Sequence, residues 1–321
     1  MLVCGWHWCS YTGMARTLAW LTATLLFSGC ASELVLDKDG ALALIPHRLS
    51  DSGHIIVPTM LNGEGPFNFA LDTGASISVV FEGPLRKALL EPAITGHVRV
   101  QGMTGSGTYP IVNLARLQVG SEVWDSARLA LLPGNGPGGG QIDGILGVDF
   151  MSRYAVSYSQ QDQVIRLYPR ELVRERSYTG WYLIPLYDLH ITDGDVTAFA
   201  FDMFIGGERI PTMLDLGSNA NLMNRRAAKS FGIRPRRSRK DTGMSGAFGA
   251  NIVATELFVW QLMVADVRWQ RSSFLIADFP IFEVLGLNKR PAAVAGTSLL
   301  EGRDFVIDFA GRRLLVTSRR K

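Results

Sequence analysis

The chain contains an internal duplication, and this feature restricts its fold more than any other, because one unit used twice fixes the architecture. The segment Leu44-Ile45-Pro46 recurs as Leu183-Ile184-Pro185. An apolar stretch that starts at a glycine and ends nine residues later at Asp72 recurs, without a gap, as a stretch that ends at Asp215. The repeat therefore includes the segments that lead into two equivalent aspartates.

Two further pairs of segments follow the aspartates. Gly102-Met103-Thr104-Gly105 matches Gly243-Met244-Ser245-Gly246, and Ile145-Leu146-Gly147 matches Val294-Ala295-Gly296. The offsets between matching segments lie between 139 and 149 residues, which is about the size of one domain. We therefore expect two similar lobes in one chain.

The length of 321 residues and the hydrophobic content of 47% suit about two globular domains. The repeat places a first lobe at residues 41–172 and a second lobe at residues 173–321. We assign residues 1–30 to a signal segment and residues 31–40 to a linker.

Within each lobe the pattern is typical of many short strands. Apolar runs rich in Val, Ile, Phe and Leu alternate with Gly, Pro, Asn and Asp, as in residues 111–119 and 257–264. Helical periodicity is confined to short stretches after each aspartate, such as residues 225–231. The sequence therefore predicts an all-β protein with minor helix.

Each repeated aspartate stands at the end of an apolar strand and before a glycine that permits a tight turn. The first reads Asp72-Thr73-Gly74 and the second Asp215-Leu216-Gly217. A single Asp-Thr-Gly is explained fully by a surface turn. Its recurrence at the equivalent point of a repeat indicates instead that the two carboxyl groups act together.

These two loops, each with a downstream apolar-apolar-Gly element, resemble the paired active-site loops of the pepsin and retroviral aspartic proteases. The resemblance extends from about residue 41 to the end of the chain. It implies two pseudo-symmetric β-barrel lobes and an aspartic endopeptidase whose catalytic residues are Asp72 and Asp215. In that family the apolar-apolar-Gly strand threads behind the aspartate loop, as expected here for Ile145 to Gly147 and Val294 to Gly296.

The glycine-rich turns at Gly102 to Gly105 and Gly243 to Gly246 occupy the position of the family's flap. Both halves keep such a turn. In this respect the chain is similar to a two-flapped retroviral dimer fused into one chain, more than to single-flapped pepsin. The resemblance implies a polypeptide substrate and a monomer whose two lobes pair within the chain.

A pair of aspartates is suited to peptide hydrolysis because one carboxylate takes a proton from water while the neighbouring carboxylic acid protonates the carbonyl oxygen. Two carboxyl groups about 3 Å apart do not both ionise readily, so such a pair keeps one proton and titrates as a unit. Pepsin is the best-known example of such a pair.

The residues around the aspartates differ between the two loops. We expect backbone N–H groups at Gly74 and Gly217 to orient the carboxylates. We expect the Ser218 hydroxyl to bind the outer oxygen of Asp215, which Ala75, its counterpart in the first lobe, cannot do.

In the family a threonine or serine hydroxyl after each aspartate reaches across to the backbone of the opposite loop. Thr73 supplies one such hydroxyl, whereas Leu216 stands where the other is expected. The missing hydrogen bond is worth about 0.5–1.5 kcal/mol, which loosens the geometry without removing a carboxylate.

The remaining composition favours no other chemistry. The net charge is +3, and the basic run at residues 234–240 has no interleaved aromatic residues, so we expect a solvated loop and no nucleic-acid partner. We assign no metal and no cofactor, because the histidines lack ligand spacing; they are His7, His47, His54, His97 and His190. We interpret Asp143 and Asp149 as turn and surface residues.

The N-terminal region resembles a bacterial lipoprotein signal. A short positive start follows Met14, residues 18–27 are apolar but too few to span a bilayer, and Ser28-Gly29-Cys30 follows. We expect lipid attachment at Cys30, export to the periplasmic face, and the outer membrane as the destination, since Ala31 follows the cysteine. An ordinary cleaved signal remains the alternative, and the true start is Met1 or Met14.

Two other functional interpretations stay open. The first is an inactive peptide-binding or structural lipoprotein that keeps the protease fold, which Leu216 favours. The second is a homodimer in which the first lobe alone is catalytic, which covalent pairing of two matching lobes makes unnecessary.

Overall fold

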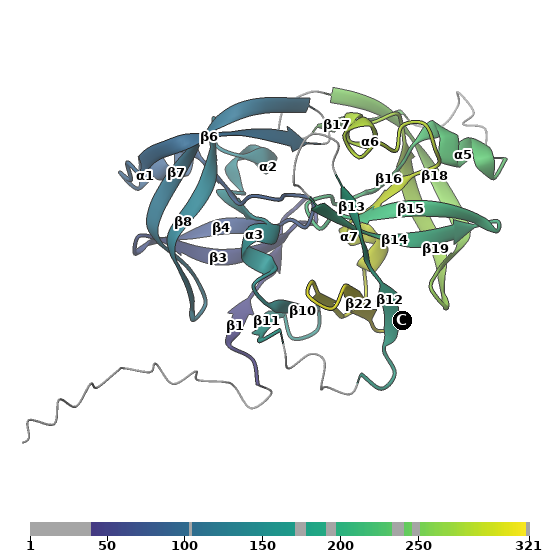
Figure 1. Ribbon diagram of the computed structural model, residues 1–321, viewed down its shortest axis with the longest axis horizontal. Coiled ribbons are helices and arrows are strands. Elements are labelled where there is room, and N and C mark those ends of the chain that lie inside the picture. Colours follow the sequence, from purple (N-terminus) through teal and green to yellow (C-terminus); the bar gives the residue numbers. More distant parts are fainter. Residues whose placement is uncertain are drawn as a thin grey trace, which may run out of the picture. The chain divides into compact units, whose positions relative to one another are not determined.

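The computed structural model describes residues 40–102, 105–170, 178–190, 197–232, 241–245 and 251–318 (Figure 1). The fold belongs to the compact unit Val35–Lys321. Some of the predicted residues lie outside the described residues, namely Cys30, Met103, Thr104, Gly246 and the basic run at 234–240.

The first lobe is built on an eight-stranded sheet in the order β2-β3-β4-β9-β5-β8-β7-β6. An additional pairing of β3 with β7 closes the six inner strands into a barrel. The strands are β2 (Arg48–Leu49), β3 (Ile55–Leu61), β4 (Glu64–Leu71), β5 (Val79–Phe81), β6 (Ala93–Gly102), β7 (Gly105–Val119), β8 (Glu122–Leu132) and β9 (Gly144–Leu146).

The second lobe repeats this order strand for strand, as β13-β14-β15-β20-β16-β19-β18-β17, and a pairing of β14 with β18 closes its barrel. The strands are β13 (Tyr187–His190), β14 (Thr197–Ile205), β15 (Glu208–Leu214), β16 (Asn221–Met223), β17 (Asp241–Ser245), β18 (Asn251–Val264), β19 (Val267–Ile276) and β20 (Ala293–Ala295). The predicted pseudo-symmetric pair of barrels is confirmed.

A third sheet, of six strands in the order β1-β11-β10-β21-β22-β12, takes strands from both halves of the chain. The halves meet where β10 pairs with β21 in antiparallel register, and Tyr158 stacks on Phe305 there with ring centroids 4.7 Å apart. The strands are β1 (Ala43–Pro46), β10 (Ala155–Ser159), β11 (Val164–Tyr168), β12 (Tyr182–Pro185), β21 (Phe305–Asp308) and β22 (Arg313–Val316).

The repeated Leu-Ile-Pro segments form the two outer strands of this third sheet, β1 and β12. Proline suits an edge strand because it has no N–H to donate to a neighbour. Ile45 and Ile184 are buried there, while the leucine before each is exposed, as expected when successive side chains point to opposite faces. The duplication thus accounts for the joining sheet as well as the barrels.

The helices are short, as predicted: α1 (Glu82–Lys87), α2 (Pro137–Gly140), α3 (Val148–Met151), α5 (Arg225–Ser230), α6 (Pro280–Val284) and α7 (Thr297–Leu300). The helix expected near residues 225–231 begins after Asn224, whose side chain accepts a hydrogen bond from the Ala227 N–H and so caps the first turn. None of the helices among the described residues is long and apolar enough to cross a membrane.

Candidate active site

The two aspartates emerge at equivalent strand ends, Asp72 after β4 and Asp215 after β15. A second strand runs parallel to each of them, β9 beside β4 and β20 beside β15. The N–H of Asp72 donates to Leu146 O at 3.0 Å, and the N–H of Asp215 donates to Ala295 O at 2.9 Å. The apolar-apolar-Gly elements therefore lie against the aspartate loops, as the resemblance implied.

The two loops bring their carboxyl groups together in one place. A Cβ atom added to Gly217 would lie 2.2 Å from Cγ of Asp72, and one added to Gly74 would lie 2.8 Å from Cγ of Asp215. Each carboxyl group therefore rests on the glycine of the opposite loop, where no other residue fits. The two carboxyl groups also share a hydrogen bond.

Backbone N–H groups orient both carboxylates, as predicted. Asp72 Oδ1 accepts from Gly74 N at 2.7 Å and from Ala75 N at 3.1 Å. Asp215 Oδ1 accepts from Gly217 N at 2.9 Å. Donors of this kind stabilise the ionised form of a carboxyl group.

The environments of the two carboxyl groups differ. Asp72 is half-buried, whereas Asp215 is 6% exposed. Burial raises the pKa of Asp215 well above its ordinary value, and the charge of Asp72 and the hydrogen bond between them raise it further, while the backbone N–H groups of Gly217 and Ser218 oppose this. Burial also raises the pKa of Asp72, but the hydrogen bond from Asp215 and the two backbone N–H groups oppose this. The shared proton is therefore favoured on Asp215.

Thr73 makes the expected bridge between the loops. Its hydroxyl donates to Leu214 O at 2.8 Å and accepts from Leu216 N at 3.0 Å. The Leu216 side chain makes no corresponding hydrogen bond to the first loop. It is fully buried in the main apolar cluster, among residues from both halves of the chain. The second loop thus replaces a hydrogen bond by packing.

The expected bond from the Ser218 hydroxyl to the outer oxygen of Asp215 is wrong. That hydroxyl donates instead to Ala220 O at 2.7 Å, within its own loop. A main-chain carbonyl two residues away is a local partner that Ser satisfies easily, so the hydroxyl turns from the carboxylate. Ala75, by contrast, does bind its aspartate, through its N–H.

The interpretation of Asp149 as a surface residue is also wrong. Its carboxylate accepts from Ser78 N at 2.8 Å and from the Ser78 hydroxyl at 2.7 Å, and Gly147 N donates to that hydroxyl at 3.0 Å. Burial raises the pKa of Asp149, and its bonds to Ser78 oppose this. Asp149 and Ser78 therefore fasten the strand behind Asp72.

In the second lobe a single residue, Asn221, holds the strand behind Asp215. Asn221 accepts from Gly296 N at 3.0 Å and donates to Ser273 O at 3.0 Å. Asp143 is likewise more than a turn residue, because its carboxylate accepts from the Asn68 N–H on β4 at 2.8 Å. The two halves use different residues here, so the repeat gave no signal of these supports.

The described parts of the predicted flaps are the stems of two hairpins. β6 pairs with β7 up to Gly102 and Gly105, and β17 pairs with β18 up to Ser245 and Asn251. The second stem includes Gly243 and Met244. The first stem lies next to helix α6 of the second lobe, as Figure 1 shows. The first hairpin thus extends from its own barrel to the other.

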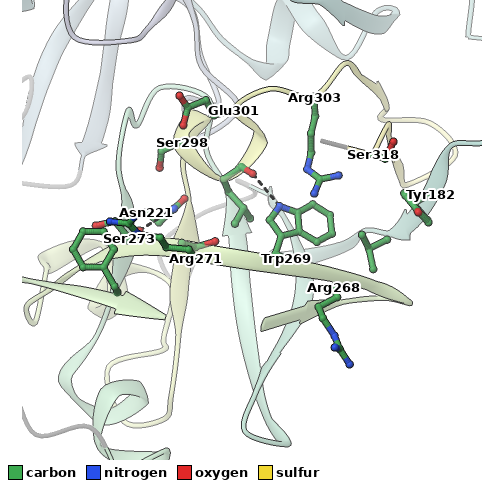
Figure 2. Close-up of a pocket in the computed structure, with 14 residues that line it drawn as sticks. Tyr182, Asn221, Arg268, Trp269, Arg271, Ser273, Ser298, Glu301, Arg303 and Ser318 are labelled. Atoms are coloured by element: carbon green, nitrogen blue, oxygen red, sulfur yellow. Dashed lines mark hydrogen bonds between the residues drawn. The ribbon is translucent and has the colours of Figure 1, made fainter. Parts of the chain in front are cut away.

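A cavity of about 470 Å³ lies in the second lobe and contains neither aspartate (Figure 2). Asn221 lies on its wall, with the Trp269 indole N–H donating to Leu299 O at 3.0 Å. The guanidinium of Arg303 lies 4.2 Å from the Trp269 ring centroid and donates to Thr317 O at 2.6 Å. These polar groups bind the protein itself, so the cavity gives no indication of a ligand.

Two closed barrels, a joining sheet and a pair of seated aspartates define an aspartic-protease fold. Comparison with known families agrees: a model described as aspartyl protease matches residues 57–150 and 202–299, more than half of the chain. The chain belongs to the aspartyl protease family. No curated protein matches it. No group of three or more metal-ligating side chains occurs among the residues that the structure describes.

Proposed function

We propose that the protein is an aspartic endopeptidase that hydrolyses peptide bonds with a water molecule activated by Asp72 and Asp215. The observation that carries this proposal is that each carboxyl group lies against the glycine of the opposite loop. Both aspartates come from one chain, so a dimer of first lobes is not needed.

The difference between the two carboxyl groups assigns their roles. Ionised Asp72 takes a proton from water, whose oxygen bonds to the peptide carbon, while Asp215 gives its proton to the carbonyl oxygen. The diol then collapses: the proton on Asp72 passes to the leaving nitrogen, the C–N bond breaks, and a diol proton returns to Asp215. The pair ends in its starting state.

This mechanism predicts a bell-shaped dependence of kcat/KM on pH, on the acidic side of neutrality. Turnover rises as pH increases through the ionisation of Asp72, because the base must be charged. It falls as pH increases further and Asp215 loses its proton. Burial raises the pKa values of both groups, so the pH profile should rise and fall at pH values above the pKa of an ordinary aspartate.

The test is incubation of the protein, purified after expression of the full chain, with a diverse peptide pool at several pH values. We expect internal cleavage by wild type and none by Asp72→Asn. Peptide binding without cleavage by a folded wild type across acidic and neutral pH would replace this proposal by that of a binding module. Equal cleavage by both proteins would overturn the catalytic role of Asp72.

We also propose that the protein is a lipoprotein on the periplasmic face of the cell envelope, at the outer membrane. The support is the apolar segment followed by Ser28-Gly29-Cys30 and the absence of an aspartate after the cysteine. Mass spectrometry of the mature N-terminus should find a lipid-bearing Cys30. An unmodified N-terminus at another residue would overturn the anchor and favour an ordinary cleaved signal.

A further inference from the structure

A turn of the first half of the chain, Ser50–His54, binds the loop that carries the second aspartate. His54 Nε2 lies 3.0 Å from the carbonyl oxygen of Gly217, 163 residues further along the chain. A carbonyl oxygen only accepts hydrogen bonds, so Nε2 carries a proton. In the neutral ring Nδ1 is then an acceptor, and the Ser52 hydroxyl lies 2.8 Å from it. The imidazole is thus held at both nitrogens.

Two more hydrogen bonds join the turn to the second half. The side-chain amide of Asn219 donates to Ser52 O at 2.7 Å, and the Thr297 hydroxyl donates to Gly53 O at 3.2 Å. Asn219 follows the aspartate loop, and Thr297 begins the helix after β20. The turn therefore contacts the second lobe at three residues, Gly217, Asn219 and Thr297.

Hydrogen bonds within the turn stabilise its conformation. Ser50 N donates to His54 O at 2.9 Å, and His54 N donates to the Ser50 hydroxyl at 3.0 Å. Gly53 has a φ of +86°, a left-handed conformation that favours glycine. These local bonds hold the backbone of the turn that carries the imidazole.

Gly217 is the residue on which both carboxyl groups depend. Its N–H donates to Asp215 Oδ1, and its Cα faces the carboxyl group of Asp72 closely enough to exclude a side chain. We propose that His54 is a positioning residue of the aspartate pair, which holds Gly217 from the opposite lobe and so supplies a cross-lobe hydrogen bond where the Leu216 side chain makes none.

The family match does not account for this turn, because the matched segment of the first lobe begins at residue 57. The effect on turnover rests on the proposed peptidase function, whereas the hydrogen bond itself does not.

His54 also affects the charge of the pair. Burial lowers the pKa of His54, and the Gly217 carbonyl and the Asp72 carboxylate oppose this. The titratable groups around His54 in the described residues are Asp72, its partner Asp215, and Asp51 of the same turn, whose carboxylate accepts from Gln141 at 2.6 Å. A charged imidazole favours the ionised form of Asp72.

Three variants of the full chain separate these contributions. His54→Leu removes the donor, and we expect kcat to fall about ten- to a hundredfold with little change in KM, because the loop shifts under the carboxyl groups. His54→Gln keeps an N–H donor without a charge, so kcat at the pH optimum should stay near wild type. The acid limb of the pH profile, where turnover rises as Asp72 ionises, should move to higher pH. Gln141→Ala, which removes one exposed hydrogen bond of the same turn, should match wild type.

A wild-type kcat in His54→Leu, or an equal loss in His54→Gln and His54→Leu, would overturn the positioning role. If His54→Leu fails to fold, His54→Gln and its pH profile carry the test, and an unmoved acid limb would contradict the link to Asp72.

A second readout needs no turnover and keeps this inference distinct from the peptidase proposal. Nitrogen-15 NMR of wild type near neutral pH should show the His54 ring as the neutral tautomer with its proton on Nε2. A proton on Nδ1, or a signal averaged between tautomers, would overturn the contact with Gly217 even in an active enzyme. The expected tautomer in a protein that cleaves no peptide would support the contact and reject the peptidase function.

Discussion

The loop after β4 and the loop after β15 occupy the same place in the same strand order, yet they hold their aspartates by different means. In the first, Asp72 is half-buried, accepts from two backbone N–H groups and has Thr73 bridging to the other lobe. In the second, Asp215 is buried, accepts from the backbone N–H groups of Gly217 and Ser218, and is followed by the apolar Leu216.

The comparison separates what the duplication preserves from what it leaves free. Both loops keep the glycine on which the opposite carboxyl group lies, because any side chain there would displace that group. The surroundings differ: Asp215 lies deeper than Asp72, so burial and the charge of Asp72 raise its pKa well above the ordinary value. This difference favours the acid role for Asp215 and the base role for Asp72.

The largest difference between the loops should appear when the two glycines are enlarged. Gly217→Ala places a methyl group 2.2 Å from Cγ of Asp72, whereas Gly74→Ala places one 2.8 Å from Cγ of Asp215. We expect both to lower kcat/KM for peptide cleavage, Gly217→Ala by about 10²-fold or more, since the displaced carboxylate loses its geometry. Circular dichroism should show both folded, and a greater loss in Gly74→Ala would contradict the comparison.

Removal of the Thr73 hydroxyl should have the next largest effect, on stability. Thr73→Val keeps the side-chain shape but leaves the buried Leu214 carbonyl and Leu216 N–H without their partner, at about 1–3 kcal/mol for each group. We expect the free energy of unfolding in urea to fall by about 2–6 kcal/mol. The control is Thr95→Val, which loses one long hydrogen bond of 3.4 Å from an exposed residue. Its free energy of unfolding should fall by less than about 0.5 kcal/mol. Equal effects would show that the bridge adds nothing.

The smallest effect should come from restoring a hydroxyl to the second loop. Leu216→Thr and Leu216→Val have nearly the same shape, so both lose packing and both should be less stable than wild type. If the loops are equivalent in geometry, the threonine hydroxyl reaches the backbone of the first loop. The free energy of unfolding of Leu216→Thr should then exceed that of Leu216→Val by about 0.5–1.5 kcal/mol. Thermal unfolding measures the difference. A less stable threonine variant would mean that the second loop has repacked around leucine, leaving the hydroxyl unpaired.

The sequence was sufficient to predict the parts of the site that are present in both halves of the repeat. Asp72 and Asp215 with their glycines stand at a fixed offset, and the family resemblance implied the position of the strand behind each aspartate loop. The Thr73 bridge followed from the family resemblance.

The parts that sequence reasoning missed depend on contacts between distant residues of ordinary types. Ser78 with Asp149 supports the first loop, and Asn221 supports the second, so comparison of the halves finds no shared pattern. His54 meets Gly217 only because of the Ser50–His54 turn and the approach of two lobes. The Ser218 hydroxyl binds Ala220 O and not the Asp215 carboxylate, which the sequence alone does not decide.

The central claim is that Asp72 and Asp215 form one catalytic unit, and its most direct test is kcat/KM of the single and double asparagine variants on a peptide that wild type cleaves. We expect Asp72→Asn and Asp215→Asn each to lower kcat/KM by about 10²- to 10⁴-fold, with little further loss in the double variant, because each single change already breaks the proton-sharing pair. Near wild-type turnover in either single variant, or losses that multiply in the double variant, would contradict the shared mechanism.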